Sequence, residues 1–213
     1  MPIDTLVLRG ALFTTLSAAA LAGCGKSESP SSSGAASKDK APPAAPIDVA
    51  AVNALVPEAL KAKLEFEKRD IVLERGRDKM TYTVAAPKGW KHASKMFANL
   101  EPESGTFGMF NKLKVNSNCD GACEPKDWAA ISDKVDFAPY AKGKIVKDEK
   151  GKNRRTMIAE GAGATSAVNV IVAWWDDGGR NYWTCSAALE QDLAAAAPAF
   201  EKACQVVNIE GDD

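Results

Sequence analysis

The sequence predicts an α+β fold, in which helices pack on a largely antiparallel sheet within a single domain. Three observations support this prediction. Apolar and polar residues alternate in segments such as Met80–Val84, which is typical of strands with one buried face. The turn sequence Asp177-Gly178 lies between two such segments, as in an antiparallel hairpin. Apolar residues recur at helical spacing in Gln191–Cys204, near the end of the chain.

The expected elements follow one another from Pro57, where a short helix begins. The turn Pro87-Lys88-Gly89 ends the first clear strand, and Asp148-Glu149-Lys150-Gly151 joins two later ones. After Met80–Val84 we expect a strand over Thr106–Val115, a helix over Pro125–Val135, strands over Lys144–Lys147, Arg154–Glu160, Ala167–Trp175 and Arg180–Leu189, and the helix Gln191–Cys204.

The N-terminus reads as a targeting segment. Residues 10–22 form an uncharged apolar run behind the basic side chain of Arg9, and the run is too short to cross a bilayer, which takes about 20 residues. Leu21-Ala22-Gly23-Cys24 resembles the lipobox of bacterial lipoprotein precursors. The resemblance implies cleavage before Cys24, a diacylglycerol on its sulfur and acylation of its new amino group. An ordinary secretory signal with a chance cysteine is the alternative.

The chain therefore divides into three parts. Residues 1–23 are the expected lipoprotein signal peptide, and residues 24–47 are the lipidated cysteine with a disordered linker. Gly25–Pro46 contains no aromatic or large aliphatic side chain, so it cannot bury enough apolar surface to offset its chain entropy. Residues 48–213 are the globular domain. Lipoproteins that stay in the inner membrane often carry aspartate directly after the lipidated cysteine. Gly25 stands at that position here, so we expect the protein in the outer membrane, facing the periplasm.

The charge balance narrows the range of partners. The chain has 27 basic and 28 acidic side chains among its 213 residues, a net charge of -1. Nucleic-acid binding calls for a clustered basic excess, so we expect no nucleic-acid partner. Contact with the membrane is expected through the lipid anchor, because two or more acyl chains suffice for stable anchoring.

Four cysteines remain once Cys24 carries lipid, and they allow three pairings. An even number in an exported domain points to disulfides. A final helix that doubles back over the preceding strand would bring Cys185 and Cys204 together, and Cys119 and Cys123 would close a small loop. We therefore expect the bonds Cys119–Cys123 and Cys185–Cys204. A redox centre or a four-cysteine zinc site are the alternatives, but the spacings depart from both patterns.

Catalytic and cofactor motifs are absent from the sequence. His92 is the single histidine, and no nucleophile elbow, phosphate-binding loop or zinc-binding helix motif accompanies it. We expect His92 to be a surface residue, and we assign no catalytic, cofactor or metal site. Asp176 and Asp177 are adjacent acids in a turn, and we interpret them as residues that keep the turn soluble.

The closing hairpin carries a group of aromatic residues. With Asp177-Gly178 as its loop, Trp175 lies opposite Arg180 and Val172 opposite Trp183. One face of the hairpin then holds Val168, Val170, Val172, Trp174, Trp183, Cys185 and Leu189, and the other holds Ile171, Ala173, Trp175, Arg180, Tyr182 and Thr184. The first face should form core beneath the last helix, because it carries Cys185.

The second face of the hairpin is the candidate binding face. Trp175 and Tyr182 beside Arg180 would offer stacking surface and a cation to a sugar ring or a partner protein. The alternative is that a helix such as 125–135 covers this face, which would make it a second core.

The segment Tyr82–Trp90 resembles the strand-Pro-x-Gly-Trp corner of PsbP/Mog1-type domains. Those domains are mostly binding or assembly modules, so the resemblance implies no catalytic residues. We therefore expect a membrane-anchored envelope lipoprotein that is not an enzyme and that binds or assembles with an envelope protein or glycan. The alternative is an envelope hydrolase of cell-wall or sugar polymers, with Asp176 and Asp177 as acid and base.

Overall fold

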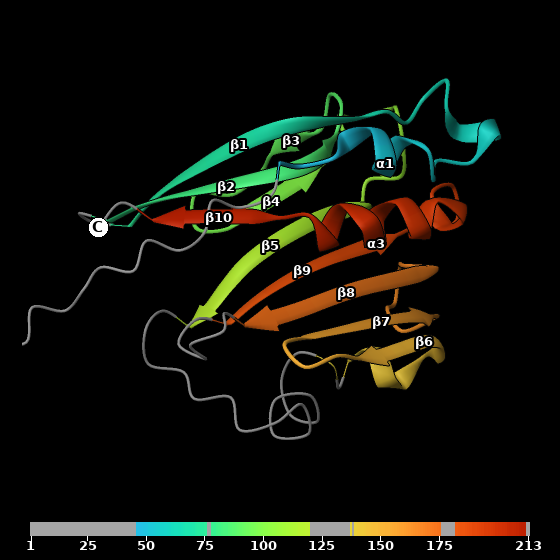
Figure 1. The fold of residues 1–213 in the computed structure, drawn as a ribbon. Coiled ribbons are helices and arrows are strands. Elements are labelled where there is room, and N and C mark those ends of the chain that lie inside the picture. Colours follow the sequence, from blue (N-terminus) through green and yellow to red (C-terminus); the bar gives the residue numbers. More distant parts are fainter. Residues whose placement is uncertain (1–45, 76–77, 120–136, 138, 176–181, 212–213) are drawn as a thin grey trace, which may run out of the picture. The chain divides into compact units, whose positions relative to one another are not determined.

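The computed structural model describes residues 46–75, 78–119, 137, 139–175 and 182–211, which belong to one compact unit. Every pairing between strands of this part is antiparallel. The predicted largely antiparallel sheet with helices packed on it is therefore confirmed, although the helices are few and the strands form two sheets (Figure 1).

The smaller sheet has three strands in the order β1-β2-β10. They are β1 (Phe66–Arg75), β2 (Asp78–Pro87) and β10 (Asn208–Gly211). The larger sheet has seven strands in the order β3-β4-β5-β9-β8-β7-β6. They are β3 (Lys91–His92), β4 (Ala98–Glu101), β5 (Lys112–Cys119), β6 (Lys144–Lys150), β7 (Arg154–Glu160), β8 (Val168–Trp175) and β9 (Tyr182–Leu189).

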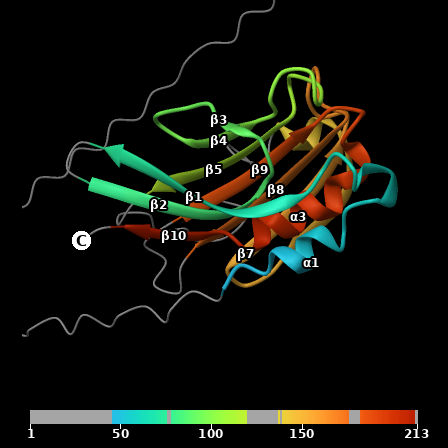
Figure 2. The ribbon, with the colours of Figure 1, turned by 90° about the horizontal axis from the view of Figure 1, so that it is seen from above.

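The helical elements are short. They are α1 (Val49–Asn53), the 3₁₀ turns η1 (Glu58–Leu60), η2 (Tyr140–Lys142) and η3 (Ala194–Ala196), and α3 (Ala197–Gln205). Helix α3 contacts β8 and β9 of the larger sheet and β2 of the smaller one, and α1 packs on α3 and β1 (Figures 1 and 2). Helix α3 therefore joins the two sheets.

The main core lies beneath α3. Phe200 of α3 packs against the rings of Phe66 and Trp90, with centroids 5.2 Å and 5.7 Å away. The predicted inner face of the hairpin belongs to this core, since Val170, Val172, Cys185 and Leu189 are fully buried. Burial of so much apolar surface is the main stabilising term for such a fold.

A second, smaller core lies on the opposite face of the larger sheet. It contains Phe137, Met157, Ile171, Ala173 and Tyr182, with Tyr140 packed against them. Strands β7, β8 and β9 therefore carry buried side chains on both faces. Such strands read as almost continuous apolar runs, as Val168–Trp175 does.

The register of the closing hairpin differs from the predicted one. Trp175 pairs with Tyr182 and Val172 with Cys185, two positions from the expected partners. The connection is therefore longer than a two-residue turn. A shift of two keeps every side chain on its face, because side chains alternate with a period of two. The predicted faces of the described residues are therefore correct although the predicted partners are wrong.

The strand expected over Thr106–Val115 begins only at Lys112. The preceding residues form a loop around Asn111, whose side chain is fully buried. The Asn111 amide donates to the Gly108 carbonyl and to Asp192 and accepts from the Glu190 N–H, at 2.7–3.1 Å. These hydrogen bonds fix the backbone conformation of the loop. The pattern of apolar residues in the sequence does not reveal them.

Two of the three predicted helices coincide with helical elements, although their lengths differ. Only the single turn η1 follows Pro57, and the predicted helix Gln191–Cys204 starts at Ala194 as a 3₁₀ turn. The expected helix over 125–135 lies outside the described residues. Within the part that the structure describes, no helix is long and apolar enough to span a membrane.

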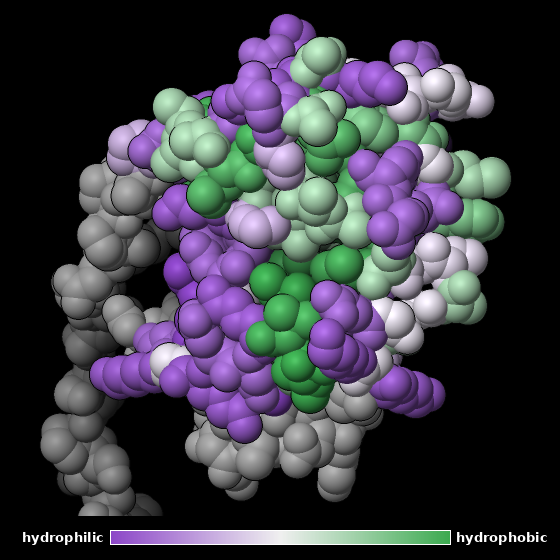
Figure 3. All heavy atoms as spheres, turned by 90° about the vertical axis from the view of Figure 1, so that its right-hand side faces the viewer, coloured by the Kyte–Doolittle hydropathy of each residue, from purple (hydrophilic) through white to green (hydrophobic). Residues whose placement is uncertain are grey.

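One exposed edge of the larger sheet carries apolar side chains. Strand β6 presents Ile145 and Val146 to solvent, and a bulge at this point leaves Val146 without a partner on β7. Figure 3 views the side of the unit on which β6 lies, and hydrophobic side chains there lie between hydrophilic ones. The flanking Lys144 and Lys147 suit such an edge, since lysine discourages pairing with another chain.

Candidate functional site

The structure joins Cys185 on β9 to Cys204 on α3 in a disulfide, with the two Cα atoms 5.2 Å apart. This is the pair that the sequence predicts. Cys119 ends β5, but Cys123 lies outside the described residues, so the second bond stays a prediction. Cys24 also lies outside them, together with the acids Asp176 and Asp177.

The predicted binding face does not include an exposed Tyr182. Its side chain is only 5% exposed and packs in the second core beside Phe137 and Met157. Apolar residues on β7 and β8, together with Phe137, make this half of the face a core, so the tyrosine offers no open ring for stacking. The Trp175 side chain and Arg180 lie outside the described part of the chain, and their role stays a prediction.

An ion pair borders the second core. The Arg155 guanidinium is 5% exposed, lies 4.2 Å over the Phe137 ring and donates two hydrogen bonds, of 2.8 Å and 3.0 Å, to the Asp148 carboxylate. These hydrogen bonds hold the pKa of Asp148 below its usual value of 3.8. Two parallel bonds fix both side chains in one geometry.

The other half of the same sheet face is polar and hollowed, and we call it the sheet-face cavity. Its volume is about 330 Å³. Two neighbouring rows of cross-strand partners form its floor: Asn99, Lys114 and Ser186 in one, and Lys112, Ala188 and Asn169 in the other. Phe97 and Tyr140 complete the lining.

Small side chains in the middle of the floor explain the hollow. Ser186 and Ala188 of β9 lie between long side chains on β5 and the Asn169 side chain on β8. A short side chain next to long ones leaves space above the sheet, and a hydroxyl in that space adds a hydrogen-bonding group. The volume lies near the lower end of the range for small-molecule sites.

Two lysines give the sheet-face cavity its charge. Lys112 and Lys114 lie on the same face of β5, with Cα atoms roughly 7 Å apart at strand spacing. Neither forms an ion pair with an acid among the described residues. The Lys114 ammonium lies 4.3 Å from the centre of the Phe97 ring, a cation–π contact that restricts its movement.

An amide in the floor has unused hydrogen-bonding capacity. The Asn99 side chain donates to Glu101 at 3.0 Å, while its buried Oδ1 atom has no hydrogen-bond partner. An unpaired buried polar atom lowers the stability of the protein. A ligand that donates a hydrogen bond to this oxygen would therefore bind more tightly. The cavity thus combines two cations, an amide oxygen and aromatic walls.

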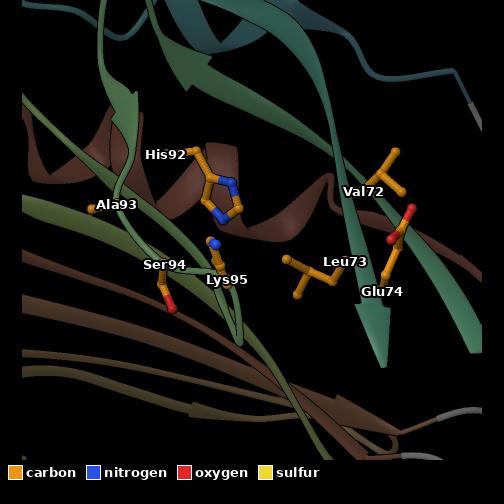
Figure 4. A pocket seen from close by; sticks show the side chains of 7 residues that line it. All are labelled: Val72, Leu73, Glu74, His92, Ala93, Ser94 and Lys95. Carbon is orange, nitrogen blue, oxygen red and sulfur yellow. The ribbon is translucent and has the colours of Figure 1, made fainter. Parts of the chain in front are cut away.

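A second cavity, of about 660 Å³, lies between β1 and the segment that begins with β3. Val72, Leu73 and Glu74 line it from β1, and residues 92–95 line it from the other side. In Figure 4 the Leu73 side chain points toward His92 and Lys95, whereas those of Val72 and Glu74 lie on the far side of β1. The cavity therefore has a backbone edge on each side.

His92 is exposed, as the sequence predicts, and its Nε2 lies 2.8 Å from the Phe97 carbonyl oxygen. Within the described ranges, no group of three or more histidine, cysteine or acidic side chains could hold a metal ion.

Sequence reasoning did not find the sheet-face cavity. A signal existed in Lys112-Leu113-Lys114-Val115, where lysine alternates with apolar residues and so occupies the solvent face of a half-buried strand. The sequence does not show that β5 pairs with β9. This pairing places the small residues Ser186 and Ala188 beside the two lysines.

Solved structures of similar layout include the following two. The Ran-binding protein Mog1p of Saccharomyces cerevisiae is 9% identical, with a TM-score of 0.41 over 68% of this chain and 96% of the yeast chain. Cyanobacterial PsbP (CyanoP) from Synechocystis is 11% identical, with a TM-score of 0.37 over 61% of this chain and 86% of its own. Both belong to the type that Tyr82–Trp90 resembles. No family model and no curated protein matches the chain.

Proposed function

We propose that this protein is a lipid-anchored binding module of the cell envelope that holds an anionic ligand in the sheet-face cavity. The proposal of a lipid anchor is based on the sequence Leu21-Ala22-Gly23-Cys24 and on the linker that follows it. The proposal of an anionic ligand is based on one observation, a hollow that contains Lys112 and Lys114, neither of which forms an ion pair with an acid among the described residues.

The chemistry of the cavity favours carboxylate or phosphate groups. Two ammonium groups on one strand face repel one another, and an anion between them removes this repulsion while accepting charge-assisted hydrogen bonds. The Ser186 hydroxyl can donate a further bond to the same group. Phe97 and Tyr140 at the sides suit an apolar or ring-shaped body attached to the anion. These groups bind and orient a ligand, which supports a binding role rather than catalysis.

Calorimetric titration of the full-length protein in detergent with citrate and with pyrophosphate tests the proposal. The double variant Lys112→Gln, Lys114→Gln should weaken binding at least tenfold, a loss of about 1.4 kcal/mol or more. Added salt should weaken binding by the wild type, because partly exposed charges are screened.

The matched control is Lys144→Gln, which removes a lysine of β6 that pairs with Glu160 at 3.2 Å, away from the cavity. This variant should bind as the wild type does. Equal losses in the control and the double variant would mean that only net charge matters, and unchanged binding in the double variant would refute the assignment of the cavity.

A further inference from the structure

The second cavity lies between two strand edges that have no partner strand within the described part of the chain. Strand β1 ends the smaller sheet and β3 ends the larger one. At one end of the gap the edges are joined, since the Arg69 guanidinium of β1 donates to the Trp90 carbonyl. Beyond it, among the described residues, no backbone hydrogen bond joins Val72 or Glu74 to the segment 92–95. We call this gap the edge cleft.

The hydrogen-bond pattern of β1 shows which backbone groups face the edge cleft. The Lys88 N–H donates to the Glu65 carbonyl at 2.7 Å, directly before the pair Phe66–Pro87. In antiparallel strands, pairs that exchange hydrogen bonds alternate with pairs that do not. Leu73 therefore bonds to β2, while the N–H and C=O groups of Val72 and Glu74 point outward.

The same reasoning applies to β3. The Ala93 N–H donates to the Asn99 carbonyl at 2.9 Å, next to the pair His92–Leu100. Ala93 therefore bonds to the β4 side, and the backbone groups of His92 point away from β4. Both walls of the edge cleft thus present unused main-chain donors and acceptors.

The wall formed by residues 92–97 is held in place before any ligand binds. The Ser94 Oγ atom accepts hydrogen bonds from the N–H groups of Met96 and Phe97 at 3.1 Å and 3.2 Å. His92 lies within hydrogen-bond distance of the Phe97 carbonyl. A wall fixed in this way loses little freedom when a ligand binds, which favours affinity.

We propose that the edge cleft binds an extended peptide segment of a partner protein by strand addition. The peptide main chain pairs with the outward groups of Val72 and Glu74 on β1, and its other edge faces His92. Its inward side chains lie against Leu73, which favours β-branched apolar residues at alternate positions. This proposal does not depend on the sheet-face cavity or on its lysines.

The linker of this chain is a poor occupant of the edge cleft. Its longest stretch without proline, residues 31–41, contains no β-branched or aromatic side chain, so it has little tendency to form a strand. A partner segment free of proline makes the full set of main-chain bonds. Truncation of residues 25–45 would reveal occupancy by the linker, because peptide binding would then become stronger.

Fluorescence polarisation tests the inference with a labelled peptide of alternating threonine and valine that carries terminal lysines for solubility. The full-length protein in detergent should bind this probe, and the same probe with N-methylated valines should bind at least tenfold more weakly. Absence of binding at about 1 mM protein, or equal binding of both probes, would overturn the inference.

Proline substitution tests the protein side of the same contact. Val72→Pro with Glu74→Pro removes the two outward N–H groups and leaves the bonds to β2 in place, because an edge strand tolerates proline there. The double variant should bind the probe at least tenfold more weakly. The control Val72→Ala with Glu74→Ala keeps both N–H groups and should stay within about twofold of the wild type.

Amide hydrogen exchange of the wild type gives an independent measurement that needs no variant. Addition of the probe should slow exchange at Val72 and Glu74, while Ile71 and Leu73, already bonded to β2, should not change. Protection from exchange that is confined to other strands would place the peptide elsewhere and refute the inference. Equal affinity of the proline and alanine variants for the probe would do the same.

Discussion

At the scale of single residues, the pair Arg155–Asp148 shows how a buried charge depends on its partner. Arg155 is almost fully buried, whereas the Asp148 side chain is 28% exposed. A buried guanidinium that loses its carboxylate keeps its desolvation cost but loses the compensating attraction. The ring of Phe137 compensates only in part, since a cation–π contact contributes less than a bidentate ion pair.

Asp148→Asn should therefore destabilise the protein by about 3 kcal/mol at neutral pH. Urea unfolding followed by tryptophan fluorescence measures the loss. Glu149→Gln is the matched control, because Glu149 is exposed and its contact with Lys147 lies at the surface. Its effect should stay below about 1 kcal/mol. Similar effects of both variants would contradict the assigned role of Asp148.

The pair Arg155–Asp148 also makes the free energy of unfolding depend on pH in the acidic range. The pKa of Asp148 is lower in the folded protein than its usual value of 3.8, because Arg155 stabilises the charged carboxylate. The contribution is therefore present above pH 3.8 and disappears as the pH falls through the lower folded value. The difference in unfolding free energy between wild type and Asp148→Asn should shrink in urea titrations below pH 3.8.

Residue-level predictions from sequence were reliable where they rested on alternation. Cys185 and Leu189 lie on the buried face as expected, because that face follows from strand period alone. Tyr182 was assigned to the correct face, but its exposure was not predictable. Its burial depends on Phe137 and Met157, which come from other parts of the chain.

At the scale of elements, the disulfide links the last long strand to the last helix. Cys185 and Cys204 are both buried, in the main core between β9 and α3. The bond therefore holds α3 against the larger sheet, at the place where α3 also contacts β2. Loss of the bond should loosen the join between the two sheets.

The double variant Cys185→Ala, Cys204→Ala should lose about 3 kcal/mol of stability, from the chain-entropy cost of a loop of about 20 residues. For a domain of this size, that corresponds to a fall in melting midpoint of roughly 6–12 °C. Calorimetry under non-reducing conditions measures it. A midpoint equal to that of the wild type would argue against the bond.

Elements with strong local signals were predictable, and those that depend on distant partners were not. The strands at Arg154–Glu160 and Val168–Trp175 appear where turn and alternation place them. The segment before Lys112 looked like a strand because of its apolar residues, but Asn111 and two distant acids hold it as a loop. Strand β10 carries too short a pattern to be recognised without β2 beside it.

At the scale of the whole molecule, the sequence predicted one sheet and the structure has two. The split arises because, among the described residues, the β1–β2 hairpin pairs with no strand of the larger sheet, and β10 returns from the end of the chain to pair with β2. Such a long-range choice leaves no mark in local periodicity. The α+β class was nevertheless predictable, since it follows from the mixture of strand and helix patterns.

The predicted lipid anchor belongs to the scale of the whole molecule, and it can be tested without knowledge of the ligand. Cys24→Ser should abolish labelling by a fatty-acid analogue, because the serine hydroxyl cannot form the thioether. The variant should also move from the membrane fraction to the soluble fraction. Labelling that survives the substitution would refute the predicted lipidation.

The place of β10 has a consequence for how the protein acquires its structure. Strands β1 and β2 come early in the chain, whereas the strand that completes their sheet follows the whole of the larger sheet. In a chain that emerges from a ribosome or a translocation channel with its N-terminus first, the β1–β2 hairpin has no third strand until residues 208–211 are released. A hairpin alone is only marginally stable. A chaperone that shields strand edges would therefore be needed most at this hairpin, and truncation of the last six residues should slow maturation more than it lowers the stability of the larger sheet.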